Sequence, residues 1–173
     1  VAPKRVCTDV WPVEVAKWAP SLSYSVAVGT STQRKAALSS SSDIVIVNYD
    51  NLDKLTSLSG FDGIVFDELT RLKNPSGKRF KALEKLLEPV KVRWGLTGSF
   101  TSNGLEDVFG QCKIIDQSLL GRSKGAFLQQ HFCLRHLHSL SHIPFFRTGL
   151  AAIGSFWTRE FLTCELLLLI QKL

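Results

Sequence analysis

Several features that would mark a protein class are missing from this sequence. Methionine is absent from all 173 positions, so we expect that Val1 is not the natural start and that the chain is part of a longer protein. The first residues lack the pattern of a signal peptide, so none is expected. The apolar run at residues 166–170 is too short to span a bilayer, so no membrane partner is expected.

The cysteines and histidines do not form a pattern typical of metal sites. The four cysteines show neither close pairing nor metal-ligand spacing, so a disulfide framework or a structural zinc site is not expected. The four histidines crowd into residues 131–142, without acidic partners nearby. This cysteine usage is typical of a reducing, intracellular setting.

The charge of the chain leans to one sign. Lysine and arginine number 21 against 15 acidic residues, which gives a formal net charge of +6 and a pI of about 9.3. An excess of this kind favours a polyanionic partner such as nucleic acid, although it also occurs in proteins that bind none.

The pattern of apolar residues indicates an α/β protein. Apolar or alternating runs typical of strands occur at residues 24–28, 44–47, 64–66 and 90–96. Helical spacing of apolar residues follows or precedes each run, at 11–18, 32–38, 52–58, 80–87 and 105–112. Because strands alternate with helices, we expect a mostly parallel sheet with helices on both faces.

The strand at residues 64–66 ends on two adjacent carboxylates, Asp67 and Glu68. Ligands of open α/β sheets bind just beyond the carboxyl ends of the strands. A nucleotide site needs one acid there to hold Mg²⁺ through water and a second to orient or deprotonate a water. The alternative is that the pair caps the next helix.

The character of the sequence changes near residue 133. From there to residue 173 charged residues are sparse, and no helical or strand period is sustained. We therefore expect two parts: a folded domain at 1–132, and a tail at 133–173 that is either foreign to the fold, as after a shifted reading frame, or disordered.

Three blocks in order resemble the first motor lobe of superfamily-two helicase-like ATPases. They are VAPKRV with its downstream tryptophans, FDELTRLKNPSGKRFKAL and GLTGSFTSNGLEDVFGQ. The Lys-Asn pair after the acids is similar to the Swi/Snf type, including its phage and bacterial members. The resemblance covers about residues 1–132 and implies a RecA-like fold, a partial first lobe of a P-loop NTPase.

The resemblance implies a set of nucleotide-site roles. Asp67 would bind the Mg²⁺ that accompanies ATP, and Glu68 would polarise the attacking water. Thr97, Gly98 and Ser99 would belong to the motif that couples the nucleotide site to DNA.

It also implies contacts with double-stranded DNA. Pro3, Lys4 and Asn48 would lie near the loops that hold a DNA backbone. Lys73 and Asn74 would either stabilise the loop after the acid pair or contact DNA.

The chain departs from the family pattern at several points. No Gly-rich loop ending in Gly-Lys-Ser/Thr occurs in it, and the second RecA-like lobe that completes the ATP site is absent. Thr70 stands where many relatives carry His, and Phe100 stands where Pro is usual. Since phosphoryl transfer depends on positioning and electrostatics, we expect the chain alone not to hydrolyse ATP.

Other functions remain open at this stage. The parent could be an RNA helicase or a restriction-type translocase, or the chain could be a non-catalytic remnant that binds DNA through its basic surface. A gene product without function is a further alternative. The leading hypothesis places the protein in the cytoplasm of a bacterial or phage-infected cell, or in the nucleus of a eukaryote.

Overall fold

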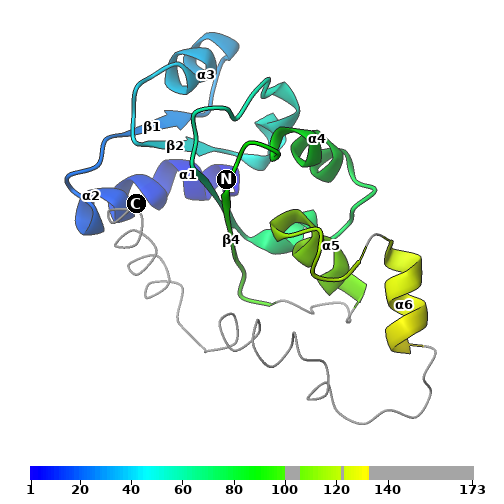
Figure 1. Ribbon diagram of the computed structural model, residues 1–173. Coiled ribbons are helices and arrows are strands. Elements are labelled where there is room, and N and C mark those ends of the chain that lie inside the picture. Colours follow the sequence, from blue (N-terminus) through cyan, green and yellow to red (C-terminus); the bar gives the residue numbers. More distant parts are fainter. Residues whose placement is uncertain (100–105, 122, 133–173) are drawn as a thin grey trace.

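The structure is a computed structural model that describes residues 1–99, 106–121 and 123–132 (Figure 1). Its elements, in chain order, are α1 (Lys4–Asp9), α2 (Trp11–Trp18), β1 (Tyr24–Ala27), α3 (Ser31–Leu38), β2 (Ile44–Val47), the 3₁₀-helix η1 (Tyr49–Lys54), β3 (Gly63–Asp67), the 3₁₀-helix η2 (Leu69–Leu72), α4 (Lys78–Leu86), β4 (Val92–Leu96), α5 (Glu106–Ile115) and α6 (Lys124–Phe132). Within these ranges no helix has the length and apolar character needed to cross a membrane.

The first two residues join two strand pairs. β1 pairs with β2 and β3 with β4, both in parallel. The Ala2 N–H donates to the Val47 carbonyl at 3.0 Å, and the Asp67 N–H donates to the Val1 carbonyl at 2.8 Å. The Val1 amine donates to the Val65 carbonyl at 2.6 Å. The order of strands across the sheet is therefore β1, β2, residues 1–2, β3, β4. This confirms the predicted parallel sheet of an α/β protein.

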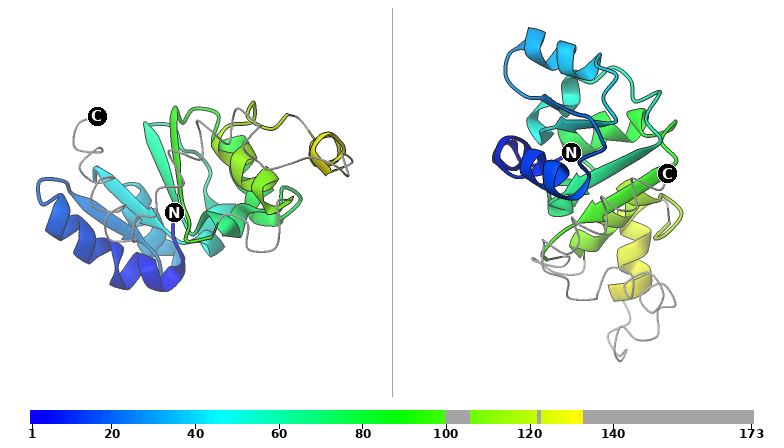
Figure 2. Two further views of the ribbon diagram at one scale, coloured as in Figure 1. Left: turned by 90° about the horizontal axis from the view of Figure 1, so that it is seen from below. Right: turned by 90° about the vertical axis from the view of Figure 1, so that its left-hand side faces the viewer.

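Two apolar clusters cover the two faces of the sheet. Alternation along β2 sends Ile46 to one cluster and Val47 to the other. The first cluster contains Cys7, Trp11 and Val15 of α1 and α2. The second packs η1, η2, α4 and the end of α5 against the opposite face. Figure 2 shows α1 and α2 on the other side of the strands from α5. The predicted placement of helices on both faces is therefore confirmed.

The segment after β2 differs from the sequence prediction. The leucines at 52, 55 and 58 predicted a helix, and the chain forms the 3₁₀-helix η1 but is extended again at Leu55. Leu52 and Leu58 are nevertheless buried, and Leu55 packs against the same cluster. A spacing of three fits the three residues per turn of a 3₁₀-helix, so the periodicity located a buried face, and the helix ends earlier than the leucines indicated.

The start of the chain forms a short strand end, since a parallel bridge joins Ala2 to Asn48. No loop follows, because α1 begins at Lys4 with Pro3 as its N-cap. The tail at residues 133–173 and the substitution at Phe100 lie outside the described residues.

In a chain that begins at Val1, the buried amine of this residue makes stability depend on pH. Burial lowers the pKa of this amine from 8.0 to about 6, and the nearby Cys7 and Asp67 only partly oppose the effect. Between these pH values the unfolded chain binds a proton that the folded chain does not, so the free energy of unfolding should rise with pH. A shift of this size corresponds to roughly 2–3 kcal/mol.

Urea denaturation from pH 5.5 to 8.5 measures this effect on a chain whose first residue is a free Val1. The control carries two added residues before Val1, so a peptide N–H replaces the amine. The four histidines are common to both forms, so any contribution that they make cancels in the difference. The rise should therefore appear in the difference between the two, and equal pH profiles would contradict the prediction.

Candidate functional site

Asp67 is the last residue of β3 and lies opposite Leu96 of β4. Its side chain is only 6% exposed. The Trp11 indole N–H, from α2, donates to its Oδ2 at 3.0 Å. Trp11 is itself buried. The carboxylate is therefore held from the α2 side of the sheet while it sits at the carboxyl end of a parallel strand.

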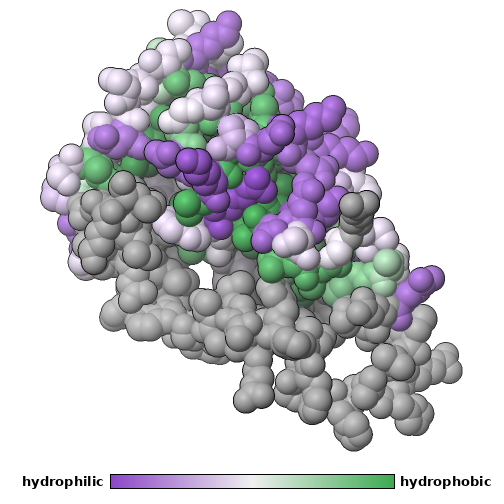
Figure 3. Space-filling model, viewed as in Figure 1, coloured by the Kyte–Doolittle hydropathy of each residue, from purple (hydrophilic) through white to green (hydrophobic). Residues whose placement is uncertain are grey.

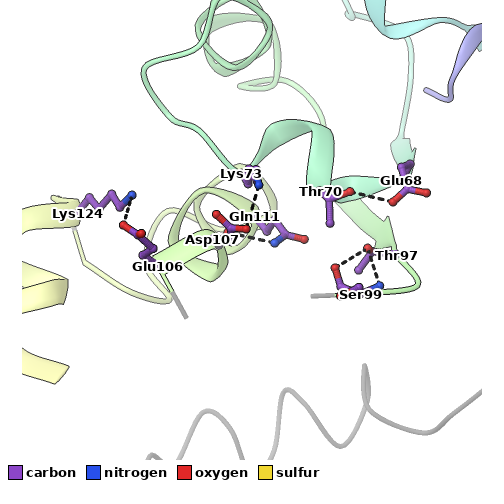
Figure 4. Close-up of polar contacts among 9 residues, drawn as sticks. All are labelled: Glu68, Thr70, Lys73, Thr97, Ser99, Glu106, Asp107, Gln111 and Lys124. Atoms are coloured by element: carbon purple, nitrogen blue, oxygen red, sulfur yellow. Dashed lines mark hydrogen bonds and ion pairs between the residues drawn. The ribbon is translucent and has the colours of Figure 1, made fainter. Parts of the chain in front are cut away.

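Glu68 turns the chain sharply away from the strand. Its φ of 64° and ψ of 56° are left-handed, and it is the one non-glycine with positive φ in the described ranges. The Tyr49 hydroxyl donates to the Asp67 carbonyl at 2.9 Å and approaches the Glu68 carbonyl at 3.4 Å. Thr70 donates to Glu68 Oε1 at 2.8 Å (Figure 4). Strained backbone of this kind clusters at functional sites.

Burial, reinforced by the neighbouring Asp67, raises the pKa of Tyr49 far above its ordinary value. Its hydroxyl therefore stays protonated at neutral pH and remains available as a donor. This role was not predicted from the sequence, because the carbonyl that accepts the hydrogen bond lies 18 residues away.

The predicted residues of the third block lie beside the acids. Thr97 directly follows Leu96, so it comes next to Glu68 at the same edge of the sheet. The Thr97 hydroxyl donates to the Ser99 carbonyl at 3.1 Å and accepts from the Ser99 N–H at 3.3 Å. Figure 4 shows this turn at the end of β4. Gly98, at its tip, is exposed.

Lys73 and α5 hold the far side of the acid-pair loop. Lys73 Nζ lies 3.0 Å from Asp107 Oδ2, with about a third of the lysine side chain exposed. Gln111 Nε2 donates to the Asp107 carbonyl at 3.0 Å. A Cβ on Gly110 would lie 2.0 Å from the Lys73 carbonyl oxygen. Lys73 was expected either to stabilise the loop after the acid pair or to contact DNA, and its contact with Asp107 is of the first kind.

The residues predicted for DNA contact are distributed along the same edge. Pro3 follows the short strand of residues 1–2, and Lys4 is exposed in the first turn of α1. Asn48 follows β2, is 3% exposed and accepts a hydrogen bond from Asn51. The Asn74 side chain is exposed and accepts from a backbone N–H two residues later, which closes a turn.

The side-chain oxygens at this edge fit a Mg²⁺ ion that keeps several water ligands better than a metal ion coordinated by protein side chains alone. Two adjacent carboxylates and the Thr97 and Ser99 hydroxyls supply oxygen, the ligand that Mg²⁺ prefers. No group of three or more acidic, His or Cys side chains converges in the described part of the chain. Two acids that act through water match the way Mg²⁺ is held with substrate phosphates. No stretch of the sequence supplies the Gly-Lys-Ser/Thr phosphate loop.

Removing the Tyr49 hydroxyl should destabilise the protein. Tyr49→Phe leaves the carbonyl of Asp67 without this donor in a buried position, which costs about 1–3 kcal/mol. Urea denaturation followed by tryptophan fluorescence measures the loss. The control is Tyr24→Phe at the other tyrosine, which is 41% exposed, where a change within about 0.5 kcal/mol is expected. Equal effects at the two positions would contradict the assigned role.

Adding a methyl group at Gly110 should push α5 away from the acid-pair loop. Gly110→Ala places a Cβ against backbone atoms that cannot rotate away, and overpacking of this kind costs about 1–3 kcal/mol. Gly125→Ala in α6 is the matched control, because a Cβ there meets nothing within 4 Å. It should gain up to about 1 kcal/mol from helix propensity. If both variants shifted the midpoint of urea denaturation by the same amount in the same direction, the close contact of Gly110 with Lys73 would be refuted.

Comparisons with known proteins agree with this geometry. The SNF2-related domain family matches residues 1–136. Protein p41 of Acyrthosiphon pisum secondary endosymbiont phage 1 is 39% identical over 145 residues, 76% of this chain and 32% of that protein. The structure is similar to the Sulfolobus solfataricus SWI2/SNF2 ATPase core in complex with dsDNA, with a TM-score of 0.61, 29% identity and coverage of 74% of this chain and 26% of that one.

The chain thus spans about a third of the phage relative and about a quarter of the Sulfolobus chain. The fold is that of an α/β RecA-like lobe, as the resemblance implied. The chain belongs to the SNF2-related domain family, and its helicase-like, Swi/Snf-type character is shown by that match.

Proposed function

We propose that this lobe supplies the Mg²⁺-binding acid, the water-activating acid and part of the DNA grip to an ATPase that translocates on duplex DNA. The observation that carries the proposal is the placement of Asp67 and Glu68 at the carboxyl end of β3, with Glu68 in a left-handed turn. Similarity to an ATPase core whose structure was solved with dsDNA supports the choice of partner.

The two acids are given different tasks by their surroundings. Asp67 is nearly buried and oriented by the Trp11 indole, which suits it to hold Mg²⁺ through water in one fixed direction. Glu68 is half-buried and bonded through one oxygen to Thr70. It orients the attacking water and takes its proton. When bound, Mg²⁺ and ATP supply the charge neutralisation and the phosphoryl group.

The neighbouring turn is suited to respond to the nucleotide. Thr97 and Ser99 satisfy each other within a short turn that directly continues β4. Because β4 pairs with β3 up to Asp67, a displacement at the acids is transmitted through one strand to this turn. In our proposal the turn of Thr97, Gly98 and Ser99 couples the state of the nucleotide to the DNA-binding loops.

The DNA side of the proposal uses the loops at the same edge. Lys4 offers an exposed charge, and the Pro3 and Asn48 segments offer backbone groups beside it. Asn48 itself acts through the loop that its buried side chain holds, and Asn74 through its turn. Lys73 reaches DNA only by leaving Asp107, so its main contribution is to keep the acid-pair loop in place.

The chain by itself should not turn over ATP. The residues of this sequence provide the acid pair but no phosphate loop, and no arginine from a second RecA-like lobe. Since catalysis of phosphoryl transfer depends on positioning all three parts, turnover is expected only when the lobe is joined to the missing pieces.

The proposal is tested by ATPase assays on this chain and on a longer form with a phosphate loop and a second lobe. The long form should hydrolyse ATP, with stimulation by duplex DNA, and Glu68→Gln should lower kcat at least about a hundredfold, as general-base loss does. Glu88→Gln, an exposed acid after α4, is the control and should leave the rate unchanged.

The choice of activating polymer separates the related functions. Stimulation of the long form by RNA or single-stranded DNA in place of duplex DNA would favour an RNA helicase or a different translocase. If the long form does not hydrolyse ATP while the short chain still binds DNA, the motor function is wrong. The lobe would then be a non-catalytic DNA-binding module.

A further inference from the structure

A small hollow lies between α3 and η1, away from the acid pair. Its volume is about 60 Å³, roughly twice the ~30 Å³ that a water occupies in the liquid. Its apolar wall includes the last residues of two strands, Ala27 of β1 and Val47 of β2. Its charged lining consists of Arg34, Lys35 and Lys54.

The three cations come from two elements and have no acidic neighbour in the lining. Arg34 Nη1 donates to the Gly29 carbonyl at 2.5 Å, which fixes the guanidinium while four of its five N–H donors remain. Lys54 Nζ donates to Asn51 Oδ1 at 3.2 Å and keeps two further donors. Lys35 is exposed on α3.

The carboxylates closest in sequence do not neutralise the hollow. Asp50 of η1 is paired with Arg79 of α4, with 2.6 Å between Oδ1 and Nη2. Asp53 is exposed and is not among the lining residues. Figure 3 shows hydrophilic side chains at the tip of α3 and over α4, on the face where this part of the molecule lies. The local field at the hollow is therefore positive.

The lining chemistry points to phosphate. A planar guanidinium with two ammonium groups matches phosphate oxygens, whose contacts are charge-assisted and short. No aromatic ring lines the hollow, so it offers no platform on which a base could stack. The contact would then be with a backbone and would not depend on sequence.

The position of the hollow in the fold indicates the kind of molecule to which the phosphate belongs. Ala27 and Val47 end their strands at the same carboxyl edge as Asp67, because all the paired strands are parallel. Residues 1–2 lie between β2, which ends at the hollow, and β3, which ends at the acid pair, and two strand spacings from β2 to β3 amount to about 10 Å. A polymer that runs along this edge passes Lys4 on its way from one site to the other.

We propose that the α3–η1 hollow binds one backbone phosphate of duplex DNA, as an anchor at the end of the edge remote from the acid pair. This inference rests on the proposed function for its ligand. It adds Arg34 and Lys35 of α3 and Lys54 of η1 to the proposed DNA-binding residues. Lys35 and Lys54 contribute charge, and the prepositioned Arg34 contributes directed hydrogen bonds.

The test compares two double variants of the full chain that remove the same charge. Lys35→Gln with Lys54→Gln removes two of the three positive charges that line the hollow, both on exposed residues, and leaves Arg34 in place. Lys85→Gln with Lys91→Gln removes two exposed lysines near Glu84 and Glu88, beside the amino end of β4. Circular dichroism verifies that both variants stay folded. The Kd for 20-base-pair duplexes of two unrelated sequences is then measured by fluorescence anisotropy across a salt series.

The hollow variant should bind both duplexes several-fold more weakly at low salt, and its slope of log Kd against log salt should fall by about 1, as for one lost phosphate contact. The control variant should match the unaltered chain. Equal losses in both variants, or no loss in either, would overturn the inference while leaving the proposed function intact.

Two further results separate the sources of phosphate and the two proposals. Mg-ATP titrated onto the same proteins should bind the hollow variant and the unaltered chain alike, and selective weakening of ATP binding would reassign the hollow to a nucleotide. Failure of the unaltered chain to bind duplex DNA at low salt would count against DNA binding in the proposed function itself, and would overturn this inference with it.

Discussion

The fold depends on four backbone groups of the first two residues. Val1 and Ala2 each donate one backbone hydrogen bond and accept another, and their partners belong to the segments on either side. Without that bridge β1–β2 and β3–β4 would be two separate ribbons, and a two-stranded unit is marginal in water. The same bridge fixes the position of the acid pair, because the N–H of Asp67 itself is one of the donors. Sheet continuity and acid placement are therefore a single structural requirement.

Around the acids, each element contributes one restraint from a different direction. α2 supplies the Trp11 indole, η1 the Tyr49 hydroxyl, and α5 the Asp107 carboxylate that holds Lys73. None of these contacts joins residues close in sequence. The left-handed turn at Glu68 persists because the surrounding structure determines it more strongly than its local preference does.

The sequence was sufficient to predict the strands, the parallel α/β class and the edge at which the acids lie. Those features follow from local periodicity and from adjacency in the chain, as with Ile46 and Val47 on opposite faces of β2. The restraints on the acids were not predicted, since Trp11 and Tyr49 reach them only through tertiary packing. A leucine spacing of three could not distinguish η1 from an α-helix until burial was known. The DNA-contact assignments came from resemblance and remain predictions.

The backbone at Glu68 has a consequence for any attempt to improve this protein by selection. Glycine reaches a φ of 64° without the steric penalty that a glutamate carries there. Relief of a strained non-glycine residue is a common source of stabilising substitutions, at about 0.5–2 kcal/mol each. A library screened for folding alone should therefore accumulate glycine at position 68. The most stable descendants would then lack the carboxylate to which we assign the activation of water, and a screen for folding would not detect that loss.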